Sequence, residues 1–215
     1  MNDTIDMRDR ILAAATRLFA RHGFGNTSIA RIADEVGIRK PSLLYHFASK
    51  DVLHAAVIDS VVARWNERLP KLMLAANTGE GRFEAIVWEV VSFFSEDRDR
   101  ARLLLREMLD RPELIRLAVQ NYLGDWMRMI TTAIARGQRE GGIRSDIHAP
   151  TAVMQSMHQL VGGIASYDVL NAFSDASADD AYETYLTQLV RFTHSGLFVD
   201  APSLAAPSTE ATSDR

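Results

Sequence analysis

The feature that most constrains this fold is a helical spacing of apolar residues in three short segments near the N-terminus. At about 100° per residue, the apolar residues of segment 8–22 fall on one side of a helix and its arginines on the other. Gly23 follows this segment, and glycine suits the left-handed position that ends many helices. The apolar side consists of Ile11, Leu12, Ala15, Leu18 and Phe19.

The second segment begins after Thr27 and Ser28, two residues that favour a helix N-cap. Its apolar residues again share one face, and Gly37 ends the segment. Two short amphipathic helices joined by a tight glycine-containing turn are typical of a helix-turn-helix. The face consists of Ile29, Ile32, Ala33 and Val36.

The third segment lies within GIRKPSLLYHFASK, residues 37–50. Pro41 fits a first helical turn, and Leu43, Leu44 and Phe47 form a narrow apolar stripe. In a helix-turn-helix, the second helix enters the major groove, where polar groups reach base edges and phosphates. We therefore expect DNA contacts from Thr27, Ser28, Arg39, Lys40, Pro41, Ser42, Tyr45, His46 and Lys50. The shape alone also occurs in helical proteins that do not bind DNA.

The charge distribution favours an anionic partner at the N-terminal end. The chain has a net charge of −4, but residues 1–50 hold eight Lys and Arg against five Asp and Glu, whereas the remainder is acidic. The absence of cysteine excludes disulfides and thiolate metal sites, and makes the cytoplasm the expected location. No secretory signal and no apolar run of membrane-spanning length is present.

Beyond residue 50, the periodicity predicts further helices and no convincing strand. We expect helices at 50–76, 82–96, 98–110, 112–140, 150–170 and 178–197. The expected fold is all-α, with about nine helices: an N-terminal three-helix helix-turn-helix DNA-binding domain and a larger α-helical domain. The predicted boundaries are 1–50 for the DNA-binding domain, 51–199 for the larger helical domain, and 200–215 for a disordered tail.

Residues 8–55 resemble the N-terminal domain of the TetR family of transcriptional regulators. The resemblance is carried by RILAAATRLFARHGF at 10–24 and TSIARIADEVGIRKPSLLYHFASKDVL at 27–53. Two positions depart from the usual pattern: Leu44 stands where tyrosine is common, with Tyr45 one place later, and Pro41 replaces a frequent glycine. The resemblance implies a DNA-binding regulator, most often a repressor, that binds a palindromic operator as a homodimer. It also implies that the larger α-helical domain, 51–199, is the ligand-binding (effector-binding) and dimerisation domain.

The last two predicted helices are expected to form the dimer. In the TetR family they build a four-helix bundle across the two-fold axis, and here segment 150–170 has an uncharged face with small residues. A dimer also places two recognition helices about one DNA turn, ~34 Å, apart. A monomer with a small-residue helix face is the alternative. The expected interface residues are Gln155, Gln159, Gly162, Ser166, Leu186, Leu189, Val190 and Leu197.

Large aromatic and flexible side chains of the central helices could enclose a small apolar ligand, although they also suit a plain core. The candidate ligand-binding residues are Trp88, Phe93, Tyr122, Trp126, Met157, His158 and Tyr167. Ligand binding would shift the population between two dimer geometries, only one of which spaces the recognition helices for DNA.

Together with these patterns, the resemblance implies a sequence-specific repressor that a small, largely apolar ligand releases from its operator. A chromosome-organising or adaptor protein without a ligand switch is the alternative. An enzyme is not expected, because hydrolase, zinc-protease, P-loop and dinucleotide-binding motifs are absent, and the histidines lack metal-ligand spacing. No cofactor and no metal are predicted.

Overall fold

The computed structural model describes residues 6–75, 79–170, 172 and 178–199, and this part of the chain is all-α. It contains nine helices, which confirms the predicted fold class. They are α1 (Met7–His22), α2 (Ile29–Val36), α3 (Lys40–His46), α4 (Lys50–Ala75), α5 (Gly79–Ser95), α6 (Arg98–Asp110), α7 (Pro112–Arg139), α8 (Ala149–Leu170) and α9 (Ala178–Ser195). The predicted tail at 200–215 lies outside the described residues.

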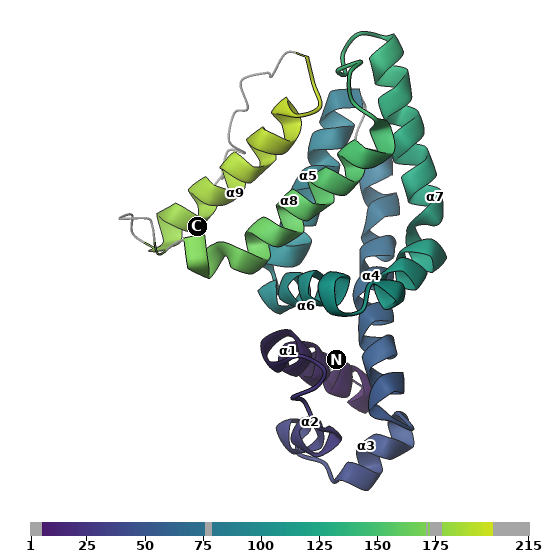
Figure 1. Ribbon diagram of the computed structural model, residues 1–215, viewed down its shortest axis with the longest axis vertical. Coiled ribbons are helices and arrows are strands. Elements are labelled where there is room, and N and C mark those ends of the chain that lie inside the picture. The colour runs from purple at the N-terminus through teal and green to yellow at the C-terminus, as the bar shows by residue number, and fades with distance from the viewer. Residues whose placement is uncertain (1–5, 76–78, 171, 173–177, 200–215) are drawn as a thin grey trace, which may run out of the picture.

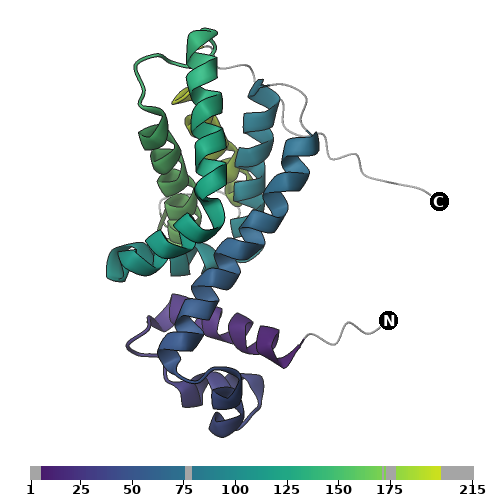
Figure 2. The same cartoon turned by 90° about the vertical axis from the view of Figure 1, so that its right-hand side faces the viewer.

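The helices form two parts that α4 joins (Figures 1 and 2). We call α1–α3 the head and α5–α9 the body. Helix α4 has 26 residues and runs from the head into the body, so the boundary predicted at residue 50 falls at its first residue. Helix α6 lies where the body meets the head, a position that we call the waist, and packs against both α1 and α8. None of the described helices combines the length and hydropathy of a membrane span.

Local interactions shape the turn between α2 and α3. The Ser28 hydroxyl accepts a hydrogen bond from the Arg31 N–H at 3.1 Å and so caps α2. Gly37 ends α2 at φ 74°, a left-handed conformation in which glycine has no Cβ penalty. The Gly37 N–H bonds to the carbonyls at the end of α2, which closes the helix before α3 begins.

A dense cluster of aromatic and polar side chains joins the head to α6. His54 of α4 is completely buried, and its Nε2 lies 3.0 Å from Oε1 of the equally buried Glu107 of α6. The His54 ring also meets the rings of Phe19 and Phe24 edge-on, with centroids 4.9 and 4.8 Å away. The orientation of the head is therefore set by side chains from α1, α4 and α6 together.

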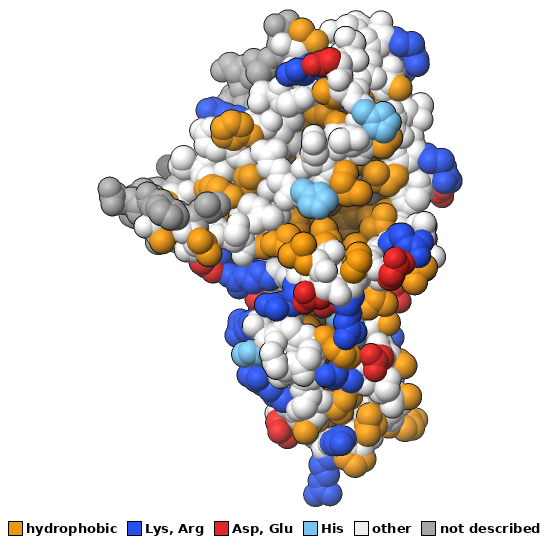
Figure 3. All heavy atoms as spheres, viewed as in Figure 1, with side chains coloured by type: hydrophobic (Ala, Val, Ile, Leu, Met, Phe, Trp, Pro, Cys, Tyr) orange, Lys and Arg blue, Asp and Glu red, His pale blue; other side chains and the backbone are white. Residues whose placement is uncertain are grey.

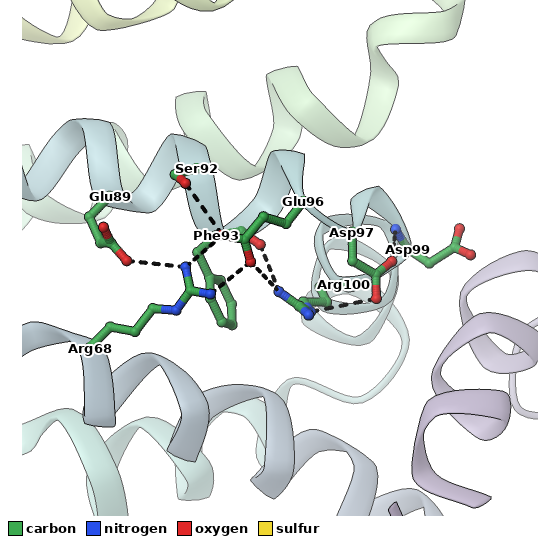
Figure 4. Close-up of polar contacts among 8 residues, drawn as sticks. All are labelled: Arg68, Glu89, Ser92, Phe93, Glu96, Asp97, Asp99 and Arg100. Atoms are coloured by element: carbon green, nitrogen blue, oxygen red, sulfur yellow. Dashed lines mark hydrogen bonds and ion pairs between the residues drawn. The ribbon is translucent and has the colours of Figure 1, made fainter. Parts of the chain in front are cut away.

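A second cluster ties α4 to α5 and α6 further into the body (Figure 4). The Arg68 guanidinium donates hydrogen bonds to Glu89 and Glu96, and Arg100 pairs with Glu96. The ring of Phe93 lies between the two guanidinium groups, with Cζ atoms 5.2 Å and 4.7 Å from its centroid. These contacts hold the body end of α4 in a fixed position relative to α5.

Candidate nucleic-acid interface

Helix α3 divides into a buried apolar side and an exposed polar side, as its sequence predicts. Leu43 and Phe47 are 0% and 2% exposed and pack into the head. On the other side the Tyr45 side chain is 89% exposed, and its ring lies edge-on to His46 with centroids 5.7 Å apart. Arg39, Lys40, Pro41 and Ser42 are exposed at the N-terminal end of the same helix.

The exposed end of α3 is positively charged. Within the described part of the chain, neither Arg39 nor Lys40 forms an ion pair with a carboxylate. The backbone N–H groups at the start of α2 and the Ser28 hydroxyl lie in the same head, and Ser28 is exposed. Cations and free backbone donors of this kind suit DNA phosphates, and a short exposed helix suits the major groove.

Thr27 has a structural role that differs from the predicted DNA contact. Its side chain is only 1% exposed, and its hydroxyl lies 2.8 Å from the Gly23 carbonyl and 3.2 Å from the Leu18 carbonyl. A hydroxyl that is buried against these carbonyls cannot reach a phosphate. Thr27 instead fixes the turn between α1 and α2.

Lys50 also has an internal partner in place of the predicted phosphate. Its ammonium donates a hydrogen bond of 2.8 Å to the Phe24 carbonyl and lies 4.1 Å from the centroid of the Phe24 ring. Arg111 covers the same ring, with its Cζ 3.5 Å from the centroid. Both cations therefore hold the loop after α1, which the helical periodicity could not reveal.

The predicted ligand residues fall into three groups. Phe93 and Tyr167 are buried, and Tyr167 packs against the rings of Tyr182 and Tyr185. His158 is exposed, with Nδ1 2.9 Å from the Met154 carbonyl, so it does not point into the body. The remaining four are partly buried and pack against the main core: Trp88, Tyr122, Trp126 and Met157.

The structure adds a polar group to this region that the sequence did not single out. The Trp126 indole N–H donates a hydrogen bond of 2.7 Å to Oδ1 of Asn66 on α4. Figure 3 shows hydrophobic side chains gathered around a hollow between α7 and α8. An apolar hollow with a few polar groups is the usual form of a small-molecule site.

The predicted dimer residues separate into buried and exposed sets. Four of them are only 1–7% exposed within the protomer: Leu186, Leu189, Val190 and Leu197. The first three belong to the main core, which removes them from a surface that a partner could touch, whereas Leu197 lies in a small second cluster and lines a groove beside α8 and α9. The others remain accessible: Gln155 and Gln159 are exposed, and Gly162 and Ser166 are half-buried. Periodicity correctly found the apolar side of α9 but could not tell that α8 and α5 of the same protomer cover it.

The accessible side of α8 and α9 carries a groove of about 300 Å³. Gln155, Gln159 and Ser156 of α8 line one wall, and Phe192 and Thr193 of α9 line the other. Phe192 is 67% exposed, and Met154 on α8 is 56% exposed. Neither residue is among the interface residues expected from the sequence, although both are large apolar side chains on an open surface.

Comparisons with known proteins cover both head and body. Residues 11–57 match the family model for bacterial regulatory proteins of the tetR family. The transcriptional repressor NicS of Pseudomonas putida is 25% identical over 142 residues, which make up 65% of this chain and 67% of NicS. Its HTH-type name places it among helix-turn-helix regulators.

Two solved structures share the fold along nearly the whole chain. The ketosteroid transcriptional regulator KstR2 of Mycobacterium tuberculosis has a TM-score of 0.71 at 16% identity, covering 91% of this chain and 97% of KstR2. FadR of Bacillus subtilis, solved in complex with stearoyl-CoA, has a TM-score of 0.67 at 14% identity, covering 87% and 97%. The helical body therefore has the same architecture as the bodies of known regulators.

Proposed function

Because this chain is a member of the TetR family of helix-turn-helix transcriptional regulators, we propose that it represses transcription by binding a palindromic operator as a homodimer. A small, largely apolar ligand bound in the body would release the operator. One observation carries the proposal: α3 buries Leu43, while Tyr45, Ser42 and the capping residue Arg39 are exposed in the described part of the chain. A bacterial operator lies in the cytoplasm, so the proposal places the protein there.

The ligand part of the proposal is supported by the hollow between α7 and α8 (Figure 3). Trp126 and Met157 belong to the helices on its two sides, and the bond from Trp126 to Asn66 reaches α4. A ligand that displaced Trp126 would thus act on the helix that carries the head. FadR, which shares the fold, was solved in complex with stearoyl-CoA, an ester with a long apolar acyl chain and a charged coenzyme A group.

The dimer part is supported by the groove of α8 and α9 and by the exposed Phe192 beside it. A second copy related by a two-fold axis would cover these residues and place two copies of α3 on the same side of the assembly. Gln155 and Gln159 would then offer hydrogen bonds across the interface.

The rival function is a DNA-binding organiser or adaptor without a ligand switch. An apolar hollow in the body favours the ligand-responsive regulator, because a protein without a ligand has no need to keep such a surface uncovered. An enzymatic function has no support in the comparisons, since the similar proteins with named activities are transcriptional regulators.

The first experiment selects bound sequences from a random pool of duplex DNA and then measures affinity for the selected site by fluorescence anisotropy. We expect Arg39→Ala to lower affinity by roughly 5- to 150-fold, the effect of losing one base-reading arginine. Tyr45→Ala should weaken binding to all sequences more evenly. Arg128→Ala on α7, 76% exposed, is the control and should bind as the wild type does. Normal affinity in both head variants would overturn the assignment of α3.

The second experiment titrates the protein–operator complex with fatty acids and acyl-CoA esters of increasing chain length. Release of the operator, accompanied by a change in Trp126 fluorescence, would support the ligand switch. If no apolar probe releases the operator and the tryptophan fluorescence stays unchanged, the result would favour the organiser or adaptor.

A further inference from the structure

The first turns of helix α6, where it crosses between head and body (Figure 1), carry three arginines and one aspartate: Arg98, Asp99, Arg100 and Arg102. The Asp99 side chain is only 7% exposed. It receives the Arg21 guanidinium of α1, with Nη2 3.3 Å from Oδ2, and the Arg102 guanidinium, with Nη1 3.1 Å from Oδ1. Asp99 therefore ties the head to the waist.

Two of these arginines also reach α8. Nη2 of Arg102 donates to Oδ2 of Asp168, and Nη2 of Arg98 donates to Oδ1 of the same carboxylate. The Arg98 guanidinium also lies over the rings of Tyr167 on α8 and Tyr182 on α9, 5.3 and 5.6 Å from their centroids. The hydrogen bond from Arg98 and the charges of both arginines keep the pKa of Asp168 below its usual range.

We propose that the ion-pair chain Arg21–Asp99–Arg102–Asp168 positions the head relative to the body, and that Asp168 is a positioning residue for DNA binding. The planar guanidinium of Arg102 can hold two carboxylates at once, and here it holds one from α6 and one from α8. A shift of α8 would thus reach α1 through two carboxylates and a single arginine. The inference deepens the proposed function by naming the route from the body to the head.

Neutralising Asp168 would free Arg102 to turn toward solvent. Arg102 would then hold Asp99 less firmly, and Asp99 would hold Arg21 less firmly. The two ends of this ion-pair chain are exposed to solvent, since the Arg21 and Asp168 side chains are 59% and 61% exposed, whereas Asp99 at its centre is buried. Exposed pairs add little stability. The expected effect is therefore on the position of the head more than on the stability of the fold.

The test measures the position of the head directly. The chain contains no cysteine, so Ala13→Cys on α1 and Ala133→Cys on α7, both at exposed positions, allow two spin labels without other changes. Dilution with unlabelled chain restricts the measured distances to single protomers. We expect Asp168→Asn to broaden or shift the distance distribution between the two labels.

Asp125→Asn is the matched control. Asp125 pairs with Arg128 on the open surface of α7, where the two side chains are 89% and 76% exposed, and this pair touches neither the head nor α6. It should leave the distribution unchanged. Arg21→Gln should change the distance distribution as Asp168→Asn does. Combining the two substitutions should change it little further, because residues of one ion-pair network are not independent.

Operator affinity gives the functional readout. Asp168→Asn should weaken binding by roughly 2- to 30-fold, the range found for residues that couple distant sites. Its melting temperature should stay close to that of Asp125→Asn. A distance distribution identical to that of the control would overturn the proposal, as would a lower melting temperature without any change in distance. If the wild type binds no DNA, the proposed function fails, but the distances still decide whether the chain of ion pairs positions the head.

Discussion

At the scale of single residues, the His54–Glu107 pair matters most to the junction of head and body. Nε2 and Oε1 are 3.0 Å apart, and the two side chains are 0% and 1% exposed. At this burial neither side chain is open to bulk solvent. Removing one partner of such a pair leaves the other buried and uncompensated, which costs far more than the loss of a surface pair.

We predict that His54→Ala lowers the free energy of unfolding by about 3–5 kcal/mol. Replacing both residues, as His54→Leu with Glu107→Leu, should recover most of this loss, because no buried carboxylate remains without a partner. Urea unfolding of His54→Ala, His54→Leu, Glu107→Leu and the double variant would measure the difference in the free energy of unfolding. A double variant less stable than either single variant would show that the two side chains contribute separately.

At the scale of elements, Gly163 lets α8 and α9 approach closely. A Cβ at Gly163 would lie 2.6 Å from the Tyr185 hydroxyl oxygen and 2.9 Å from Cδ2 of Leu189. At the preceding residue, Gly162, a Cβ would meet no atom within 4 Å. Of these two adjacent glycines, only Gly163 is required by the packing of α9 against α8 within the protomer.

These glycines provide a matched pair of substitutions. Gly163→Ala should destabilise the protein by about 1–3 kcal/mol, because Tyr185 and Leu189 must move. Gly162→Ala should be neutral or stabilising by about 0.5–1 kcal/mol, since alanine favours a helix interior over glycine. Thermal unfolding of the two variants would rank them, and equal melting temperatures would contradict the close packing of α9 at Gly163.

The link between α4 and α5 should make stability depend on acid pH. Hydrogen bonds from Arg68 hold the pKa of Glu96 below its usual range in the folded protein. The stabilisation is therefore complete above the ordinary glutamate value, about 4.3, and is lost as pH falls through the lower folded value. Glu96→Gln should flatten this acid limb, and unfolding midpoints measured from about pH 7 down to about pH 2.5 would show it. An unchanged acid limb would mean that the pair adds no stability.

At the scale of the whole molecule, the exposed apolar side chains of α8 and α9 bear on assembly. Phe192 is 67% exposed and lines the groove, and Met154 is 56% exposed elsewhere on α8. Isolated exposed apolar residues are common, but a large one that lines a groove between adjacent helices suits an interface between copies.

Sedimentation should give about twice the 24.0 kDa mass of the chain. Phe192→Glu should shift this equilibrium toward the monomer while the helical circular dichroism stays unchanged. Leu109→Glu, a change at a 78% exposed position on α6, is the control and should remain dimeric. A monomeric wild type would contradict the dimer, and a dimeric Phe192→Glu variant would move the interface to another surface.

The amino-acid sequence by itself determined where the helices lie and which side of each is apolar. Gly37 ends α2 as predicted, and Leu43 and Phe47 separate the buried side of α3 from the exposed side. These are local properties, because helical period, capping residues and glycine act over a few positions of the chain. The division of α3 could therefore be predicted without any knowledge of the body.

Only the tertiary structure decided which neighbour covers each face. In the folded chain the Thr27 hydroxyl bonds to the Gly23 carbonyl, the Lys50 ammonium bonds to the Phe24 carbonyl, and Val190 is buried within one protomer. Folding also joins His54 to Glu107, which stand 53 positions apart in the sequence. An amphipathic pattern states that a face must be covered, but contacts between distant segments depend on how the helices cross, and no local rule contains that information.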